Sequence, residues 1–208
     1  MNNSKKQLIL NWTNGFKFSK NLILAFENVK RENFIPTKFA EIAYEDGPLP
    51  IGEGQTISQP TTVMIMLDLL EIKATDKIFE IGCGSGYNAA LMAEIAKKGR
   101  IITAEIVKSL AEKAKERLNN YKNITVLSDD GVKIAKDYGP FDKIIITAAL
   151  KEFPQILIEE LNEGGIMIAP IGDRFMQTMI KLKKINGEIE SSEHGNFMFV
   201  PLQGEYGF

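Results

Sequence analysis

The sequence predicts an α/β fold in which helices cover both faces of a mostly parallel sheet. Short apolar runs alternate with helical stretches between residues 76 and 171, which is the pattern of a parallel sheet. A glycine-rich turn directly follows the first of these runs, and ligands of open parallel sheets bind beyond such strand ends. With 44% hydrophobic and 25% charged residues, the chain has the composition of an ordinary globular protein.

The length of 208 residues favours one domain with a sizeable core. We expect that domain, residues 1–208, to have three parts that differ in character. Residues 1–72 hold N-terminal helices and an active-site loop, 76–171 an α/β core that binds a cofactor, and 172–208 the C-terminal strands. No internal repeat or low-complexity segment is visible in the sequence.

Composition also excludes several classes of function. The net charge of −2 and the pI of about 5.6 argue against a protein held to nucleic acid mainly by phosphate contacts. A single cysteine excludes an internal disulfide and suits a reducing compartment. The polar start is followed by an apolar run, 8–10, that is too short for a signal peptide or a membrane span. We therefore expect a cytoplasmic protein that binds neither nucleic acid nor membrane.

The first 36 residues are expected to be helical and peripheral. Apolar side chains recur at helical spacing from Leu22 to Val29, and the pattern stops at Pro36. Asn14-Gly15 indicates a turn between two such helices. The helices are expected to pack over one end of the sheet.

Residues 44–60 are expected to form a long, ordered loop. Its prolines and glycines argue against a regular element over 47–54, while three apolar residues would anchor it to the core. A buried helix is expected to follow over 59–72. Two interpretations of Thr56 and Ser58 stay open: one of them is the N-cap of that helix, with Pro60 in its first turn, or one supplies an active-site hydroxyl.

The core is expected to alternate strands and helices. The expected strands are 77–82, 101–106, 123–128, 141–148 and 166–171. The expected helices are 87–98, 108–120 and 154–162, with a short one after Asp130-Gly131. In the tail, 176–185 and 196–202 are expected to be strands joined through the hairpin dipeptide Asn186-Gly187, at least one pair being antiparallel.

The glycine-rich turn is the first candidate binding element. Residues 80–86 read Glu-Ile-Gly-Cys-Gly-Ser-Gly, and glycines at alternate positions let the backbone turn with positive φ beside a ligand. A dinucleotide fingerprint would need a small residue at the position of Tyr87. We expect the Glu80 carboxylate to turn toward the loop and hold its amides, because it would otherwise be an unpaired acid in an apolar strand. The spacing resembles the cofactor loop of class I S-adenosylmethionine methyltransferases.

The next strand ends supply further candidate residues. Glu105 can accept both hydroxyls of a ribose, and Asp130-Gly131 can meet the exocyclic amine of an adenine. Alternatively, Glu105 is a solvated acid and Asp130 caps the next helix. Taken together in this order, they favour an adenosyl-ribose site over a nucleotide-sugar or NAD site.

The remaining reactive residues exclude several chemistries. His194 is the only histidine, so neither a histidine-based metal cluster nor a Ser-His-Asp triad can be assembled. Cys83, the only cysteine, lies in the glycine turn and is expected to pack there. The fourth strand end, Thr147-Ala148, lacks the Pro-Pro-aromatic clamp that would hold a base amine.

A more specific resemblance is found over residues 43–60, which read AYEDGPLPIGEGQTISQP. This run is similar to the signature of the protein-L-isoaspartate O-methyltransferase family, within the class I S-adenosylmethionine-dependent methyltransferases. Further matches follow in family order: Phe34-Ile35-Pro36, 80–86, Asp130-Gly131, 142–149, Gly164-Gly165 and 199–202. The resemblance covers nearly the whole chain, and it implies a Rossmann-like fold.

The resemblance implies a reaction and a set of site residues. The implied reaction transfers the methyl group of S-adenosyl-L-methionine to the free carboxylate of L-isoaspartyl residues in damaged proteins, which starts repair through a succinimide and leaves S-adenosyl-L-homocysteine. Ser58 is the implied catalytic residue, and no metal is implied. Cofactor contacts are implied for Thr56, Ile57, Glu80, Gly82, Gly84, Ser85, Gly86, Glu105, Ile106, Asp130 and Gly131. Substrate contacts are implied for Ser58, Val200, Pro201 and Leu202.

Two departures from the family pattern bear on the substrate. Glu53 stands where many relatives have histidine, and Thr61 stands where several have histidine or tyrosine; both are expected near the reaction centre. We expect a monomer that acts on damaged proteins. The alternative is a class I methyltransferase that acts on a small molecule or on RNA.

Overall fold

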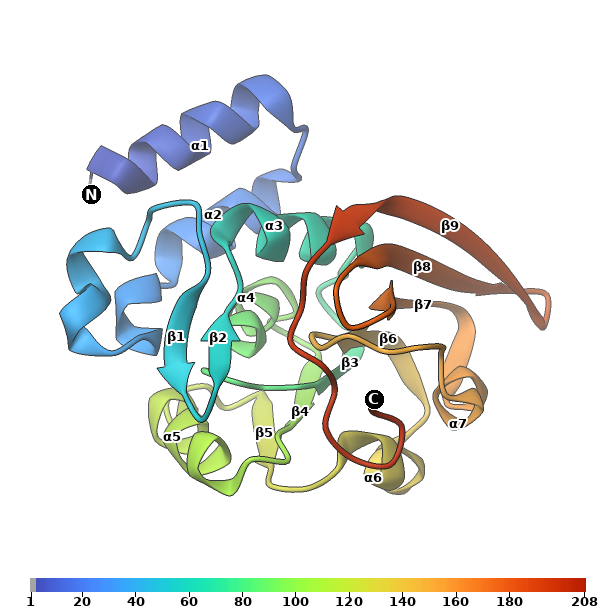
Figure 1. Cartoon of the computed structure of the whole chain (residues 1–208). Coiled ribbons are helices and arrows are strands. Elements are labelled where there is room, and N and C mark those ends of the chain that lie inside the picture. The colour runs from blue at the N-terminus through green and yellow to red at the C-terminus, as the bar shows by residue number, and fades with distance from the viewer. Residues whose placement is uncertain (1–2) are drawn as a thin grey trace.

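The structure, a computed structural model, describes residues 3–208, which form a seven-stranded sheet and a separate two-stranded hairpin (Figure 1). The strand order is β5-β4-β3-β6-β7-β8-β9; β3 to β7 are parallel, and β8 and β9 are antiparallel. The strands of the large sheet are β3 (Lys77–Ile81), β4 (Arg100–Ala104), β5 (Ile124–Leu127), β6 (Phe141–Ile146), β7 (Leu161–Gly172), β8 (Gln177–Ile185) and β9 (Glu188–Phe197). The predicted α/β fold with a mostly parallel sheet is confirmed.

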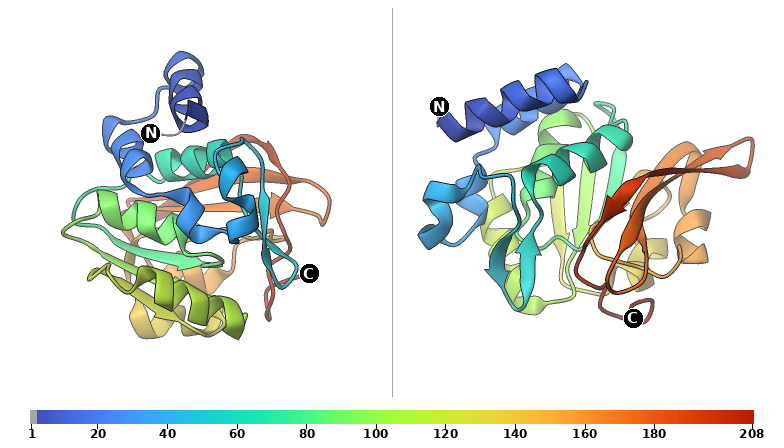
Figure 2. Two further views of the ribbon diagram at one scale, coloured as in Figure 1. Left: turned by 90° about the vertical axis from the view of Figure 1, so that its left-hand side faces the viewer. Right: turned by 45° about the horizontal axis from the view of Figure 1, so that its top comes forward.

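Helices cover both faces of this sheet (Figure 2). They are α1 (Asn3–Gly15), α2 (Lys20–Asn28), α3 (Pro60–Leu69), α4 (Tyr87–Ile95), α5 (Lys108–Leu118), α6 (Gly131–Tyr138) and α7 (Gln155–Glu159). Alternate strand residues point to opposite faces, so Ile78 and Ile101 pack with the side chains of α1 to α5. Phe79 and Ile102 pack instead under α6 and α7. The sheet therefore separates two apolar cores.

The N-terminal segment contains helices, as predicted, but α1 packs on α3 and α2 packs on α3 and α4, which are themselves helices; residues 1 and 2 lie outside the described residues. α1 is held to α3 by a hydrogen bond of 2.8 Å from the Trp12 indole N–H to Thr61 Oγ1. Two short 3-10 helices, η1 (Arg31–Phe34) and η2 (Thr37–Ile42), follow α2. Within residues 3–208, every helix falls short of the length and apolarity that a membrane crossing requires.

The segment 47–54 corrects the prediction of an irregular loop. β1 (Leu49–Gly52) pairs with β2 (Gln55–Ile57) in an antiparallel hairpin. The turn is tight because Gly52, Glu53 and Gly54 all have positive φ, which two glycines tolerate readily. Pro50 is accepted because this two-stranded sheet consists only of edges, where a missing N–H costs little. The expected anchors Leu49, Ile51 and Ile57 are buried.

The C-terminal strands correct a second prediction. Asn186 and Gly187 both have positive φ, as a two-residue hairpin turn requires, so the second strand starts at once and β9 spans Glu188–Phe197 instead of 196–202. β9 is an open edge of the large sheet. Likewise α7 ends at Glu159 because β7 already begins at Leu161.

Candidate active site

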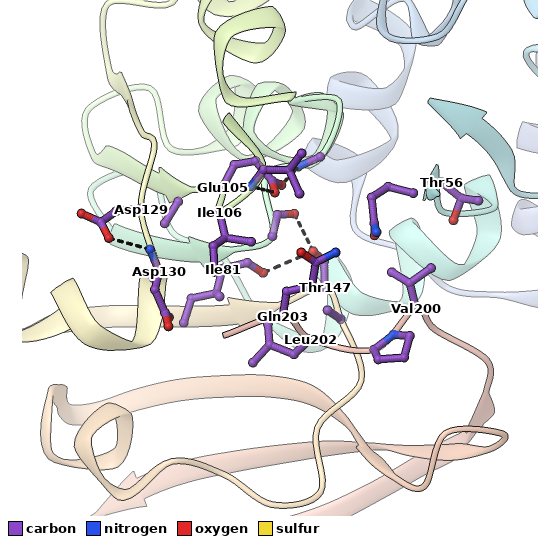
Figure 3. Close-up of a pocket in the computed structure, with 18 residues that line it drawn as sticks. Thr56, Ile81, Glu105, Ile106, Asp129, Asp130, Thr147, Val200, Leu202 and Gln203 are labelled. Atoms are coloured by element: carbon purple, nitrogen blue, oxygen red, sulfur yellow. Dashed lines mark hydrogen bonds between the residues drawn. The ribbon is translucent and has the colours of Figure 1, made fainter. Parts of the chain in front are cut away.

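A cleft lies at the carboxyl ends of β3, β4, β5 and β6, where the sequence predicts a ligand site. Figure 3 shows Asp129 and Asp130 at one end of it and Thr56 and Val200 at the other. The cleft has about 580 Å³ of space that protein atoms leave empty, part of it open to solvent. Its lining comprises Gln55, Thr56, Ile81, Gly82, Gly84, Ala104, Glu105, Ile106, Val107, Asp129, Asp130, Gly131, Thr147, Ala148, Val200, Pro201, Leu202 and Gln203.

The glycine turn forms one wall of the cleft and is held from β6. Gly82 has φ +94°, and the Thr147 hydroxyl donates to its carbonyl at 2.6 Å. A Cβ at Gly82 would lie 2.5 Å from Thr147 Oγ1. The position therefore needs glycine both for its backbone conformation and for this close approach. Thr147 lines the cleft and was not among the predicted site residues.

Glu105 holds the other side of the turn. Its carboxylate accepts the Gly84 N–H at 2.8 Å and the Val107 N–H at 2.9 Å, and the residue is 6% exposed. Each carboxylate oxygen has a second lone pair, so both can still accept hydroxyl donors from the cleft. The prediction that Glu105 faces a ribose is compatible with this position. The sequence did not predict that Glu105 also holds the glycine turn through the Gly84 amide.

Glu80 corrects the prediction that it would hold the loop amides. In the sheet register it lies opposite Thr103 of β4, whose hydroxyl donates to Glu80 Oε2 at 2.6 Å. The side chain therefore stays within the sheet, fully buried beneath the turn, and the loop amide goes to Glu105 instead. Burial away from water, together with the nearby charge of Glu105, raises the pKa of Glu80 to about 8, against the lowering effect of the Thr103 bond. This raised pKa favours the neutral form of the carboxyl at pH 7.

Asp130 fulfils the capping alternative and also lines the cleft. It is the N-cap of α6 and accepts the Val132 N–H at 3.1 Å. Asp129, which the sequence analysis did not single out, lies beside it in the cleft and accepts the Asp130 N–H at 2.8 Å. Ile106, at the opposite wall, is 41% exposed and offers an apolar surface between these polar groups.

Ser58 and Thr56 are not helix caps. The N-cap of α3 is Gln59, whose side chain makes no capping bond, and Pro60 follows it. Asp46 takes the capping role, because its carboxylate accepts the Thr61 N–H at 2.9 Å. The structure therefore favours the second alternative, in which the hydroxyls of Thr56 and Ser58 are available to a ligand.

A second cavity, which we call the groove, adjoins the cleft and contains Ser58. It has about 1020 Å³ of empty space, part of it open to solvent. Its lining comprises Pro48, Thr56, Ser58, Gln59, Thr62, Thr147, Asn196, Phe197, Met198, Phe199 and Val200. Thr56, Thr147 and Val200 line both cavities, so these three residues form the seam between them. Among residues 3–208, Ser58 Oγ has no hydrogen-bond partner.

The chain after β9 places the predicted substrate residues at this seam. The Ala149 N–H donates to the Val200 carbonyl at 2.8 Å, and the Leu202 N–H donates to the Ala149 carbonyl at 2.9 Å. This ladder fastens residues 200–202 beside the end of β6. Figure 1 shows the segment, in red, passing the strand ends toward α6.

The structure brings together most of the predicted residues. Thr56, Gly82, Gly84, Glu105, Ile106, Asp130, Gly131, Val200, Pro201 and Leu202 line the cleft, and Ser58 lines the groove. Ile57 and Ser85 line a small gap between Ser58 and the glycine turn. Glu80 and Gly86 line neither the cleft nor the groove: Glu80 is buried in the sheet, and Gly86 packs against Leu118 of α5.

The two departures from the family pattern line neither the cleft nor the groove. Glu53, at the tip of the hairpin, accepts the Ser109 hydroxyl at 2.8 Å at the start of α5. Thr61 is turned toward Asp46 and Trp12. The side chains of both residues are committed to other elements, and the expectation that they lie near the reaction centre stays a prediction.

The chemistry of the site is that of binding and orientation. A buried carboxylate, a glycine turn and an exposed apolar side chain line the cleft, and Ser58 lines the groove. Among residues 3–208 there is no group of three or more histidine, cysteine or acidic side chains placed to hold a metal. Burial raises the pKa of the Cys83 thiol well above its ordinary value, which disfavours the nucleophilic thiolate.

Comparison with known proteins gives consistent matches over nearly the whole chain. The family model described as protein-L-isoaspartate(D-aspartate) O-methyltransferase (PCMT) matches residues 3–207. The chain is 45% identical over 187 residues to the protein-L-isoaspartate O-methyltransferase of Thermosipho melanesiensis, covering 88% of this chain and 94% of the relative. The enzyme of the same name from Methanosarcina mazei is 41% identical over 207 residues, covering 98% of this chain and 85% of the relative.

A solved structure agrees with these sequence matches. It is the crystal structure of a candidate protein-L-isoaspartate O-methyltransferase from Plasmodium falciparum in complex with S-adenosyl-L-homocysteine. The TM-score is 0.84 at 28% sequence identity, and the alignment covers 96% of this chain and 98% of that chain. The likeness therefore extends over the cleft, the groove and the tail.

Proposed function

The chain belongs to the protein-L-isoaspartate(D-aspartate) O-methyltransferase family, and from this premise we propose which of its residues carry out the reaction. The enzyme is an S-adenosylmethionine-dependent protein carboxyl methyltransferase whose substrates are L-isoaspartyl residues of damaged proteins. In our proposal the cleft holds the cofactor and the groove holds the damaged peptide. One observation carries this assignment: Thr56, Thr147 and Val200 line both cavities, so the two ligands would meet at that seam.

The residues of the cleft fit the cofactor. Glu105 would accept the ribose hydroxyls, since it already orients the turn and keeps free lone pairs. Ile106 would pack on the adenine, and Asp129 or Asp130 would accept its amine. The glycine turn would lie along the methionine part. When bound, the cofactor supplies an electrophilic methyl group on a positively charged sulfur.

The protein does not need a general base for this reaction. The acceptor is a free carboxylate, and such groups titrate near about 4, so it is ionised at neutral pH. The Ser58 hydroxyl would donate a hydrogen bond to one of its oxygens and orient the other toward the seam. Ser58 is therefore an orienting donor in this proposal, and no covalent bond to it forms.

Two properties of the site would accelerate methyl transfer. Opposite charges on the carboxylate and the sulfur cancel as the transition state is approached, so a site that excludes water favours the reaction. The segment 200–202, fastened to Ala149, and the β1–β2 hairpin would supply that exclusion. Holding the two reactants in line can contribute up to about 7–11 kcal/mol of the barrier. The neighbouring backbone nitrogen would attack the carbonyl carbon of the methyl ester and expel the methoxy group, which leaves as methanol with the proton of that nitrogen, so succinimide formation would proceed without further help from the enzyme.

We also propose that the chain acts in the cytoplasm as a monomer and without nucleic acid. The single cysteine and the small net negative charge support this setting. Size-exclusion chromatography coupled to light scattering tests the monomer directly.

The test of the function uses two synthetic peptides that differ only in L-isoaspartyl against L-aspartyl at one position. Each is incubated with the protein and methyl-labelled S-adenosylmethionine, and base-labile label is counted. We expect label on the isoaspartyl peptide alone. Label on neither peptide, with cofactor binding intact, would leave the cofactor site standing and overturn the assignment of the groove to a damaged peptide.

A further inference from the structure

Arg31 is fully buried in η1 and donates its side-chain N–H groups to three backbone carbonyls. Nε donates to the Ala43 carbonyl at 2.8 Å, one terminal nitrogen to the Ser58 carbonyl at 2.9 Å, and the other to the Gly47 carbonyl at 3.3 Å. All three acceptors belong to the segment 43–58. A single planar group therefore gathers both ends of the segment that carries the β1–β2 hairpin and Ser58.

The same guanidinium also contacts the glycine turn. Its central carbon lies 5.5 Å from the ring centroid of Tyr87, within the distance of a cation–π contact. Tyr87 is the first residue of α4 and directly follows Gly86. Arg31 thus connects the segment with Ser58 to the turn that forms a wall of the cleft, although it lines neither the cleft nor the groove.

Burying this charge is expensive, which argues for a role beyond packing. Within residues 3–208, no aspartate or glutamate forms an ion pair with Arg31. Burial lowers the pKa of the guanidinium from its ordinary value, as expected for a charge removed from water. An apolar side chain of similar size generally stabilises a core as well as a buried charge does. Arginine offers instead five donors in a fixed plane, which can hold several carbonyls in one geometry.

We propose that Arg31 is a positioning residue for methyl transfer, which fixes the peptide group of Ser58 and thereby aims its hydroxyl at the substrate carboxylate. The inference rests on the proposed function, in which Ser58 orients that carboxylate. Arg31 touches neither substrate nor cofactor and acts through the Ser58 carbonyl. Because Tyr87 is stacked on the same group, the serine is positioned relative to the glycine turn.

The experiment measures four variants: Arg31→Lys, Arg31→Met, Ser58→Ala and the double variant Arg31→Lys/Ser58→Ala. Lysine keeps the charge but has no planar fork, whereas methionine removes every donor. Leu157→Ala is the control, since Leu157 is fully buried in α7 on the opposite face of the sheet. The Leu157→Ala variant is expected to lose stability, while the substituted residue is on the opposite face of the sheet from the segment 43–58.

We expect kcat with the isoaspartyl peptide to fall at least tenfold in Arg31→Lys and further in Arg31→Met. The Kd for S-adenosyl-L-homocysteine should stay within threefold of wild type in both. In the Ser58→Ala background, Arg31→Lys should change kcat by less than twofold, because its effect requires the hydroxyl. The control should keep the wild-type kcat per folded molecule.

Several results would overturn the proposal. These are a wild-type kcat in folded Arg31→Lys, a full additional loss in the double variant, or an equal fall of kcat in Leu157→Ala. If the wild-type protein does not methylate the peptide, the proposed function fails separately. The positioning role of Arg31 is then tested by amide hydrogen exchange, whose rate should rise over residues 55–59 in Arg31→Lys but not in Leu157→Ala. An unchanged exchange rate over residues 55–59 in Arg31→Lys would refute the positioning role.

Discussion

Glu80 offers a quantitative prediction, because it is a buried acid that the fold keeps protonated. Replacing it by glutamine preserves the shape and removes the titration. The pKa of Glu80 is raised from an ordinary value of 4.5 to about 8 by burial. Between these two values the folded protein holds one proton that the unfolded chain releases. The free energy of unfolding therefore falls as pH rises through this window, by about 1.4 kcal/mol per pH unit and by up to about 5 kcal/mol in all.

The Glu80→Gln variant should lack this contribution. Between pH 5.5 and 7.5 its free energy of unfolding should rise relative to wild type by roughly 2–3 kcal/mol. The absolute value at low pH is less informative, since glutamine can accept from Thr103 but would bring an N–H to the position of Glu80 Oε1, which has no partner in the described chain. An unpaired buried donor costs about 1–3 kcal/mol, and the protonated carboxyl of the wild type carries one at the same position while Thr103 donates to Oε2.

Urea unfolding of both proteins at pH 5.5, 6.5 and 7.5 measures this difference, and equal m-values verify that the same transition is compared. Other titrating groups cancel in the comparison because both proteins share them. A difference that stays constant with pH would show that Glu80 does not hold a proton in this window.

Three further predictions concern the site itself. Ser58→Ala should lower kcat about 10- to 150-fold, which corresponds to the loss of a hydrogen bond to a charged group. The Kd for S-adenosyl-L-homocysteine, measured by calorimetry, should stay near wild type. An equally large weakening of kcat and of cofactor binding would contradict the orienting role. Glu105→Ala should weaken that Kd by about 100-fold or more, since it removes the ribose acceptor and frees the Gly84 amide; an unchanged Kd would place the ribose elsewhere. Gly82→Ala should lower the melting temperature and the free energy of unfolding, the latter by more than about 2 kcal/mol, because the new Cβ would lie 2.5 Å from Thr147 Oγ1 on a backbone with φ +94°. Adding Thr147→Ala removes the clash but not the unfavourable backbone conformation, so it should restore only part of the lost stability. Full recovery would show that the backbone conformation costs nothing.

The alternating core was predictable because its signals are local. Apolar runs, glycine turns and helix periodicity lie within a few residues of each other, and the order of strand ends follows from topology rules. The hairpin β1–β2 was missed because Pro50 and three neighbouring glycine or turn residues argue against a strand in the middle of a sheet. They do not argue against a strand in an isolated hairpin.

The roles of Glu80, Glu105 and Arg31 were harder to predict from the sequence, because they depend on contacts between residues that are distant in the chain. Whether Glu80 or Glu105 holds the loop depends on the register of two strands, which places Glu80 beside Thr103 and Glu105 beyond the sheet. Arg31 makes its bonds to residues 12 to 27 positions away. Its helical surroundings in the sequence indicate only a packing element, and no short motif marks a buried guanidinium.

The open edge at β9 has a consequence for a protein that handles damaged chains. Unpaired strand edges capture extended segments, and damaged proteins expose such segments, so an enzyme of this kind risks aggregating with its own clients. β9 presents exposed Glu188, Glu190 and Glu193 along this edge. Charges of one sign on an edge oppose the addition of a further strand. These charges therefore oppose strand addition along the edge, while the groove, which we propose holds the damaged peptide, lies at the other end of the same strand.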